Sequence, residues 1–437
     1  MAHRRVRIIW SDLNGISHGR YVPERRFGGH THHAVTTLTM GIDGEIIPVE
    51  GYGPDVGFAD LTVETDVMSR RSGWEPDTDV AVADLSFENR PLPLCPRSAL
   101  ADAVAKWRAL GYEPQLGFEM EFYVMQPDAD APGGWVTLQN PMHRVYGTGK
   151  GGDTTGILLA LFEAAENASL DVEGVTGEFS PGQMELNMHY CAALESADRA
   201  FVFKEMSFEI AAERGYLLTY IGRPSATLVG SGLHVNFSLS SIAEGNNAFD
   251  DPTAEHRFSP LMGSCIGGLV KHHEGAAAFL APNTNSYKRL QPGLIAGYWA
   301  NWGLDNRIST YRVPCERGVA TRIENRMPCG SANPYLAAAV TLNAARLGFE
   351  AGLTCGDPQV GDGDAEPNTD RHTPHTLAAA LDALEADATL AATMGPDLVR
   401  GYLALKRYDV ARRDASGDEW DITKITDWEL REYLPFF

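Results

Sequence analysis

The sequence predicts an α+β protein made of a small β-rich part and a larger part in which strands and helices mix. Residues 1–92 contain short apolar or alternating runs between Gly and Pro turns, which is typical of strands. After residue 93, similar runs are separated by Ala-rich segments of helical length. We therefore expect one domain at residues 1–92 and a second at residues 93–437.

Three runs in the first part are strand candidates. They are VRIIW at residues 6–10, HAVTTLTM at 33–40 and VAVADLSF at 80–87. All three are rich in β-branched or aromatic side chains, which favour the pleated, half-buried surface of a sheet. The N-terminal domain is therefore predicted to be mainly β.

A helix is predicted to begin at the turn after residue 95. Ser98 is expected to cap it, because a serine hydroxyl can accept a hydrogen bond from an N–H of the first turn. Leu100, Val104 and Trp107 recur at helical spacing. Gly111 is expected to end this helix, as glycine often does.

The rest of the chain continues the mixed pattern. Ala-rich helices are predicted at residues 195–214 and 332–349. Residues 355–371 are rich in Gly, Pro and Asp, so we expect an exposed loop there. A final helical part begins near Pro374, where leucines from Leu377 onward recur at helical spacing.

Composition and charge exclude several classes of partner. The 437 residues carry 58 acidic and 36 basic side chains, which gives a net charge of −22. Nucleic acids and anionic membranes bind clustered Lys and Arg, so neither is expected as a main partner. No run of 18 apolar residues is present, so no membrane span is predicted.

The N-terminus and the cysteines point to a cytoplasmic protein. The start MAHRRVRIIWSD is basic, but an acidic residue follows before a signal-like apolar core has formed. The six cysteines show no CxxC spacing. They read as reduced thiols, so neither a disulfide framework nor a zinc site is expected.

Two carboxylates lie on the same face of a predicted strand at LGFEMEFY, residues 116–123. Side chains alternate along a strand, so Glu119 and Glu121 point away from the apolar face. A solvated face of a half-exposed antiparallel sheet gives the same pattern. The pair alone therefore leaves a metal site and a plain surface both open.

A second pair of carboxylates favours the metal site. In VTGEFSPGQMELNM, residues 175–188, the segment SPGQ is a good four-residue turn. A hairpin closed there would place Glu178 directly opposite Glu185. Opposed like charges destabilise a sheet, and Mg²⁺ or Mn²⁺ would neutralise them because both prefer carboxylate oxygens.

Two further segments show the same combination of an apolar face and a chemically active face. GSGLHVNFSL, residues 230–239, places His234, Asn236 and Ser238 on one face, although a lone His on a strand is more often structural. TRIENRM, residues 321–327, aligns Arg322, Glu324 and Arg326. This alignment fits either a surface ion-pair ladder or a phosphate clamp beside a metal ligand. The repetition of the pattern in four segments indicates a site.

In this order, the four segments resemble the motifs of the glutamine synthetase family, in type I-like form. Further similarities are SDLNGISHGRYVP near the N-terminus, NSYKRL, DNRISTYRVP, ANPYL and the closing DWELREYL. The resemblance implies an N-terminal β-grasp domain. It also implies a large catalytic domain in which a curved antiparallel half-barrel sheet is backed by helices. The implied activity is ATP-dependent ligation of a carboxylic acid to an amine nitrogen through an acyl phosphate.

The resemblance also implies metal ligands and cofactors. Each site would use ATP and two or three Mg²⁺ or Mn²⁺ ions. The ion nearer the amino-acid substrate would be held by Glu121, Glu178 and Glu185. The ion that bridges the nucleotide phosphates would be held by Glu119, His234 and Glu324.

Other roles follow from the resemblance in the same way. Arg289 would bind the carboxylate of the amino acid beside Gly230, and Arg307 would stabilise the transferring phosphoryl group. Phosphates would be gripped by Arg312, Arg322 and Arg326, of which Arg326 also counts among the catalytic arginines. Glu173 and Ser238 would line the nucleotide pocket.

Several positions depart from the family pattern. In the flap QPGLIAGYW, Ile295 stands where ammonia-using members carry a glutamate that helps deprotonate ammonium. Val229 replaces an asparagine that contacts glutamate, and Asn236 replaces a second histidine. The aspartate that assists ammonium binding from a neighbouring subunit has only a weak counterpart, Asp55.

These departures favour an organic amine over ammonia. Ammonium needs a negative charge for binding and a base for activation, and Ile295 supplies neither. With Trp299 and Trp302 nearby, the site would suit a larger, more apolar amine. An alkylamine would still need a base, whereas an arylamine is already neutral at pH 7. We therefore expect a γ-glutamylamide ligase that acts on glutamate and an organic amine.

Three alternatives stay open. The chain could be a true glutamine synthetase with a drifted flap, or a catalytically inactive member that serves as a structural oligomer. The acid could also differ from glutamate, because Val229 alters its contact. By resemblance we expect a ring-shaped homo-oligomer, a hexamer or dodecamer, with active sites shared between neighbouring subunits.

Overall fold

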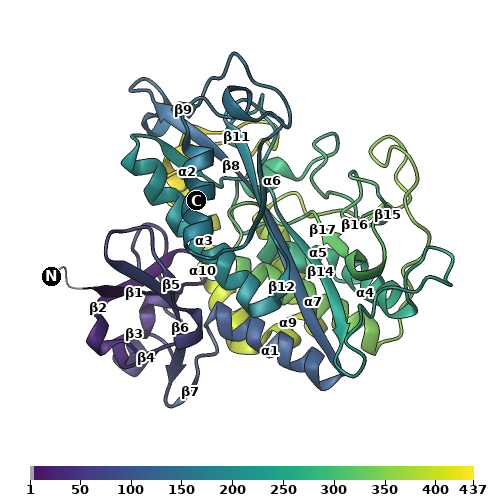
Figure 1. The fold of residues 1–437 in the computed structure, drawn as a ribbon, viewed down its shortest axis with the longest axis horizontal. Coiled ribbons are helices and arrows are strands. Elements are labelled where there is room, and N and C mark those ends of the chain that lie inside the picture. The colour runs from purple at the N-terminus through teal and green to yellow at the C-terminus, as the bar shows by residue number, and fades with distance from the viewer. Residues whose placement is uncertain (1–3) are drawn as a thin grey trace.

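A computed structural model describes residues 4–437 (Figure 1). The N-terminal part forms a seven-stranded sheet in which β1 and β6 run parallel, and the order along its main path is β2-β1-β6-β4-β3. Its strands are β1 (Arg5–Ser11), β2 (Ser17–Pro23), β3 (His30–Ala34), β4 (Asp60–Thr65), β5 (Arg71–Ser72), β6 (Thr78–Phe87) and β7 (Arg90–Pro91). This arrangement is the β-grasp domain expected from the resemblance.

One predicted strand of this domain is wrong after its first two residues. Residues 33–40 do not continue as a strand, because β3 ends at Ala34 and a 3₁₀-helix follows at Val35–Thr39. Val35 and Leu38 are both fully buried, so their spacing of three serves a 3₁₀ turn rather than an alternating strand.

The larger sheet has ten strands and curls into a half-barrel, as predicted. Its path is β10-β11-β8-β14-β17-β16-β15, and every neighbouring pair is antiparallel except β15 and β16. Its strands are β8 (Tyr112–Pro127), β9 (Trp135–Thr137), β10 (Val172–Gly177), β11 (Gln183–Met188), β12 (Cys191–Ala192), β13 (Leu217–Thr219), β14 (Leu233–Ser241), β15 (Trp302–Leu304), β16 (Tyr311–Val313) and β17 (Ile323–Asn325).

Helices cover one face of this sheet and extend the fold beyond it (Figure 1). They are α1 (Pro96–Ala109), α2 (Ile157–Asn167), α3 (Ala193–Glu213), α4 (Pro260–Lys271), α5 (His273–Leu280), α6 (Ser286–Arg289), α7 (Pro334–Glu350), α8 (Leu377–Ala386), α9 (Ala388–Met394), α10 (Pro396–Ala415) and α11 (Asp427–Tyr433). The helices predicted around residues 195–214 and 332–349 are confirmed as α3 and α7. Among the described residues, no helix has the length and apolar character needed to cross a membrane.

Helix α1 begins earlier than its predicted cap. Its N-cap residue is Cys95, which makes no side-chain capping bond, and Ser98 lies inside the first turn. Pro96 at the first helical position fixes a helical φ and lacks the N–H that would otherwise need a cap. Gly111 follows the helix end with φ +90°, as its expected role requires.

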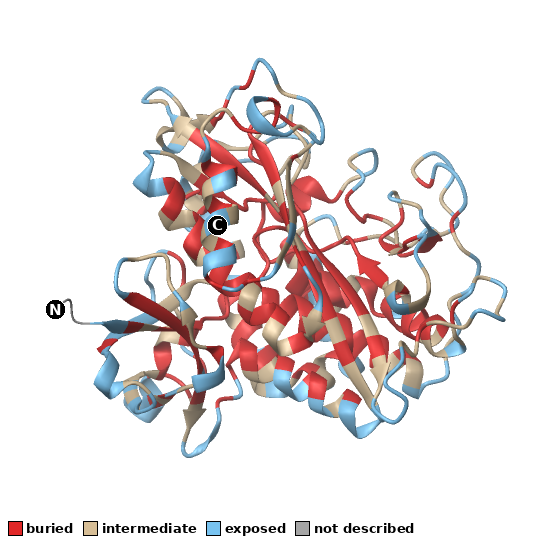
Figure 2. Cartoon of the chain, in the orientation of Figure 1, coloured by how far each residue is buried: buried red, intermediate tan, exposed pale blue. Residues whose placement is uncertain are grey.

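The helix-facing side of β8 carries the core. Leu116, Phe118, Met120 and Phe122 are at most 1% exposed, and Figure 2 shows the same burial along the neighbouring strands. Each such side chain contributes about 1.5–3 kcal/mol on burial. A one-residue slip would expose all four, so this face fixes the register and turns Glu119 and Glu121 to the other face.

A buried arginine links the N-terminal domain to helices α1 and α3 of the larger domain. Arg97 in α1 donates to Asp198 of α3 at 2.9 and 2.8 Å, and to Asp66 of the N-terminal domain at 2.9 Å. Arg97→Ala is expected to lower the free energy of unfolding by about 3–5 kcal/mol, because it leaves buried charges unpaired. Urea unfolding followed by circular dichroism measures this loss.

The matched control is Arg407→Ala, which breaks an exposed pair with Asp382 and should cost about 1 kcal/mol or less. Equal unfolding midpoints for the Arg97 and Arg407 variants would show that Arg97 does not hold the domains together.

Buried His273 gives stability a defined pH dependence. Its ring nitrogens lie 3.2 Å from the Tyr311 hydroxyl and 3.0 Å from the Thr373 hydroxyl, and burial lowers its pKa to about 4. The unfolded chain therefore takes up this proton first on acidification. Neutral His273 contributes fully to the free energy of unfolding above about pH 6.5. This contribution is lost as the pH falls toward 4, by about 3 kcal/mol in total.

The test compares urea midpoints of the wild type and His273→Gln at pH 7 and pH 4.5. The variant should lose less stability on acidification, because Gln does not titrate. An unchanged pH difference would assign the acid sensitivity to other groups.

Candidate active site

Five adjacent strands bring the predicted polar side chains to one face. In the ladder, Glu121 of β8 is paired with Glu185 of β11, and Glu119 of β8 is paired with His234 of β14. Farther along, Glu324 of β17 lies between Asn236 of β14 and Arg312 of β16. Segments far apart in sequence therefore meet because the strand register aligns them.

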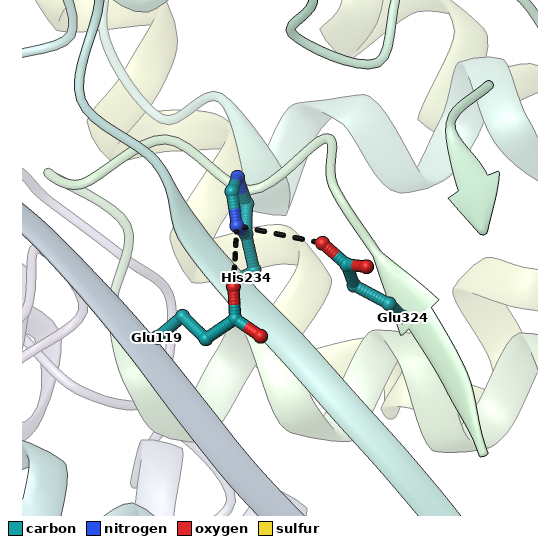
Figure 3. A group of neighbouring side chains, drawn as sticks. All are labelled: Glu119, His234 and Glu324. Atoms are coloured by element: carbon teal, nitrogen blue, oxygen red, sulfur yellow. Dashed lines mark hydrogen bonds and ion pairs between the residues drawn. The ribbon is translucent and has the colours of Figure 1, made fainter. Parts of the chain in front are cut away.

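The centre of this face is a three-residue cluster (Figure 3). His234 Nδ1 lies 3.1 Å from Glu119 Oε2 and 3.6 Å from Glu324 Oε1. One ligand atom from each residue lies within 4.8 Å of the other two. Glu324 is fully buried and His234 nearly so, so the group is held by the protein rather than by bulk water.

Three more carboxylates surround this cluster. Glu121 Oε1 lies 3.7 Å from His234 Nε2, and Glu121 Oε2 accepts the Gly232 N–H at 2.6 Å. Burial and the Glu121 charge raise the pKa of Glu178 to about 7. Burial and the charges of Glu121, Glu119 and Glu178 raise the pKa of Glu185 to about 9. Among residues 4–437, these three do not form a cluster as tight as the first.

The hairpin register differs from the predicted one. Glu178 was expected opposite Glu185, but its N–H bonds to the Gln183 carbonyl and Thr176 is paired with Glu185. The turn at Ser180–Gln183 forms as predicted, with Gln183 N–H donating to Ser180 O at 3.0 Å. Phe179 stays outside the ladder and is exposed, which shifts the pairing by two residues. The opposed like charges are instead Glu185 and Glu121.

This donor set fits a divalent cation. Burial disfavours the Glu119 carboxylate, yet hydrogen bonds and charge from His234 hold its pKa at about 2. Asn187 donates to Glu185 at 3.1 Å, while its own side-chain oxygen is buried without a partner in the described chain. Crowded carboxylates, an imidazole and an unpaired oxygen are ligands that a hard cation would satisfy.

The arginines are not a surface ladder, because Glu324 is fully buried. Arg312 donates to Glu324 at 2.6 Å and Arg326 also pairs with Glu324. Arg326 further donates to the Arg307 carbonyl at 3.2 Å. The Arg307 side chain is exposed, and its charge lowers the pKa of Glu178 against the larger opposite effect of burial. Three positive charges therefore border the carboxylate cluster.

Arg289 lies at the end of α6 against the glycine turn before β14. Its guanidinium donates to the Met327 and Arg326 carbonyls at 2.9 and 3.1 Å. A Cβ on Gly230 would lie 2.5 Å from the Arg289 side chain, so only glycine fits there. Burial lowers the pKa of Arg289. The next residue back, Val229, accepts the Tyr123 hydroxyl at its carbonyl, 2.8 Å away.

A cavity of about 390 Å³ opens beside the cluster. It is lined by three of the predicted nucleotide residues, Glu173, Ser238 and Arg322, together with Glu119. Asn236, also in the lining, donates to Glu119 at 2.9 Å and accepts from Arg322 at 3.1 Å. Arg312 and Arg326, the other two predicted phosphate ligands, pair with Glu324 instead.

Sequence reasoning missed two residues, Asn187, which donates to Glu185, and Tyr190, which lines the cavity. Asn187 shares a strand face with Glu185, so alternation alone would have found it. Tyr190 lies just beyond β11, where no sequence pattern fixed its direction.

The flap places Ile295 at the edge of the site. Ile295 is 49% exposed, and its carbonyl accepts from Arg326 at 3.4 Å. Its φ of +52° is unusual for a β-branched residue. Trp299 is half-buried next to it, whereas Trp302 is 2% exposed and packs on Phe258 in the core. The expectation that Trp302 lines the amine site is therefore wrong.

Asp55 lies in an exposed loop of the N-terminal domain. Its carboxylate accepts the N–H of Gly51 at 2.7 Å and of Gly53 at 3.3 Å. These backbone bonds lower its pKa. It is not among the residues that line the cavity of its own chain.

Comparisons with known proteins agree with this geometry. Residues 93–426 match the family described as the glutamine synthetase catalytic domain. A γ-glutamylethanolamide synthetase from Streptomyces coelicolor is 33% identical, over 98% of this chain and 91% of the relative. A glutamate–isopropylamine ligase from a Pseudomonas species is 28% identical, over 97% and 95% of the two chains.

Glutamine synthetases match at similar identity, 28% and 32% in two cases. A solved structure of a GmaS/ADP complex superposes with a TM-score of 0.83 at 27% identity, covering 99% of this chain and 97% of that one. The match spans the catalytic strands and the helices behind them. This chain therefore belongs to the glutamine synthetase family and is an ATP-dependent ligase.

Proposed function

We propose that this ligase joins the γ-carboxylate of glutamate to an organic amine and forms a γ-glutamylamide. The observation that carries the proposal is Ile295, an apolar side chain half exposed at the flap, where ammonia-using members carry a glutamate. Relatives named for ethanolamide and isopropylamine chemistry support it. The amine itself stays open between alkylamines and arylamines.

In this proposal the carboxylates and His234 hold divalent ions. Members of the family depend on ATP and divalent metal ions. Such ions, when bound, neutralise the carboxylate cluster and draw charge from phosphate oxygens. Glu119, His234 and Glu324 would hold one ion, and Glu121, Glu178 and Glu185 a second. Five of these six side chains lie on paired strands, and Glu178 directly follows β10.

The cavity beside the cluster would take the nucleotide. Its volume lies within the range of small-molecule sites. Glu173, Ser238 and Arg322 would contact ATP there, and Arg312 and Arg326 would orient phosphates from the Glu324 side. Arg307, exposed beside Glu178, would face the phosphoryl group as it transfers.

The reaction balances in two steps. The γ-carboxylate oxygen of glutamate attacks the terminal phosphorus of ATP, which releases ADP and forms γ-glutamyl phosphate. The amine nitrogen then attacks the acyl carbon, the bond to the phosphate oxygen breaks, phosphate leaves and the nitrogen loses a proton. Arg289 and Gly230 would hold the α-carboxylate end of glutamate, and Ile295 and Trp299 would border the amine.

Glutamine synthesis is the second candidate, since glutamine synthetases match this chain at similar identity. The full-length protein should be given ATP, glutamate and equal concentrations of ammonia and one amine, with the products identified by mass spectrometry. Ethanolamine, isopropylamine and aniline serve as the amines in separate reactions. We expect a γ-glutamylamide to exceed glutamine with at least one of them, whereas glutamine as the main product in every mixture would refute the proposal.

We also propose a ring-shaped homo-oligomer in which Asp55 reaches the site of a neighbouring subunit. Support comes from the exposure of Asp55 and from the absence of its side chain from the cavity of its own chain. Mass photometry should show a hexamer or dodecamer. A monomer that turns over at the full rate would contradict this assembly.

A further inference from the structure

A carboxylate from a distant loop holds the flap on both sides of Ile295. Asp364 Oδ1 accepts the Trp299 indole N–H at 3.0 Å, and Asp364 Oδ2 accepts the Gly293 backbone N–H at 2.8 Å. The two donors lie in the flap segment 293–299, before and after Ile295. One side chain therefore fixes both ends of the segment that borders the site.

The loop that carries Asp364 is itself anchored. Asp362 accepts the Asp364 N–H at 3.0 Å, which sets the direction of the chain there. Gln359 is 4% exposed, and its backbone N–H donates to Trp302 O at 2.7 Å. Asn306, next to Arg307, donates to Gly361 O at 2.9 Å. The position of Asp364 is thus set by contacts outside the flap.

The flap needs such a support between its ends. At its C-terminal end, Ala300 N–H bonds to Arg371 O at 3.0 Å, and the Tyr298 ring stacks on His372. Gly293 and Gly297 both have positive φ, at +81° and +75°. Two glycines in this region let the intervening backbone change direction at low cost. Asp364 bonds to Gly293, the first of these two glycines.

We propose that Asp364 is a positioning residue that fixes Ile295 and Trp299 as the wall of the amine site. This inference rests on the proposed function, because it takes the flap to face the amine. Asp364 touches no reacting atom and acts through Trp299 and Gly293. Both side-chain oxygens of Asp364 accept from flap N–H groups, those of Gly293 and Trp299.

Three variants separate the two bonds. Asp364→Ala removes both, Asp364→Asn keeps one acceptor oxygen, and Trp299→Phe removes only the indole donor. Asp364→Ala should raise the KM of the preferred amine about 10-fold, because both flap N–H groups lose their acceptor. The KM of ATP and of glutamate should change by less than about 2-fold. Asp364→Asn should fall between Asp364→Ala and the wild type.

A readout without catalysis tests the same contact. Hydrogen–deuterium exchange in residues 291–299 should be faster in Asp364→Ala than in the wild type, since the Gly293 N–H loses its acceptor. The control is Asp357→Ala, an exposed aspartate of the same loop, which should leave both the exchange and the amine KM unchanged. In a double-mutant cycle, the effects of Asp364→Ala and Trp299→Phe on the amine KM should be non-additive.

The outcomes distinguish this inference from the proposed function. Unchanged exchange in Asp364→Ala, or equal losses in the KM of ATP, glutamate and amine, would overturn the positioning role. Faster exchange in Asp364→Ala, with ammonia as the best substrate of the wild type, would retain Asp364 as a flap support and overturn the assigned amine chemistry.

Discussion

Replacing Glu324 by Gln is expected to lower the rate of ADP formation by about 10³-fold. Glu324 is the buried member of the three-residue cluster and the partner of both Arg312 and Arg326. Gln keeps the shape but removes the charge, so it weakens the cation site. It also removes the carboxylate that pairs with Arg326 and one of the two that pair with Arg312. Initial rates with saturating ATP and glutamate measure the loss.

The matched control is Glu113→Gln, on the same strand β8 but paired with exposed Arg108. It should change the rate less than about 2-fold, because exposed pairs contribute little. Circular dichroism confirms that both variants fold. A Glu324→Gln enzyme with near wild-type rates would remove this cluster from the catalytic machinery.

Replacing Ile295 by Glu is expected to shift the preference from an alkylamine toward ammonia. The ratio of kcat/KM for ammonia to kcat/KM for the alkylamine should rise about 30-fold, which corresponds to about 2 kcal/mol for a new charge near the ammonium. Removing the β-branch at a φ of +52° also relieves local strain. Phosphate release with each amine gives the ratio.

Ile295→Gln is the control, because it matches the length and polarity of Glu without its charge. If the charge is responsible, Ile295→Gln should move the ratio by only a few-fold. Equal shifts in the two variants would attribute the effect to side-chain size, and no shift in either would place the amine away from Ile295.

The strand faces of the site were predictable because alternation is local. Glu119, His234 and Glu324 each oppose apolar neighbours in their own strand, and burial of those neighbours decides which way the polar residues point. The sequence does not show which strands are adjacent. That information came from the family resemblance, since pairing between residues more than a hundred positions apart has no local pattern.

Register at the hairpin was not predictable in the same way. The SPGQ turn was identified, but a β-turn inside a longer loop leaves open how many residues stay outside the ladder. Phe179 is exposed and unpaired in that ladder, so the partner of Glu185 in β10 is Thr176 rather than Glu178. On its other side, Glu185 is paired with Glu121 of β8. Two carboxylates do lie opposite each other in the sheet, but they are Glu121 and Glu185.

Contacts between loops were the least predictable part. Trp299 and Trp302 are three residues apart and look alike in sequence, yet one bonds Asp364 and the other fills the core beside Phe258. Residues 355–371 were expected only to be an exposed loop. The buried side chain of Gln359 anchors that loop. It hydrogen-bonds to backbone groups of the loop that would otherwise be buried without a partner.

The most direct test of the account is Mn²⁺ binding to the full-length protein without nucleotide, followed by electron paramagnetic resonance. We expect Mn²⁺ to bind saturably to the wild type. We expect a variant with His234→Asn and Glu324→Gln to bind at least one ion fewer per chain, and Glu113→Gln to bind the same number as the wild type. Equal Mn²⁺ binding by all three proteins would show that these strands do not converge on a metal site.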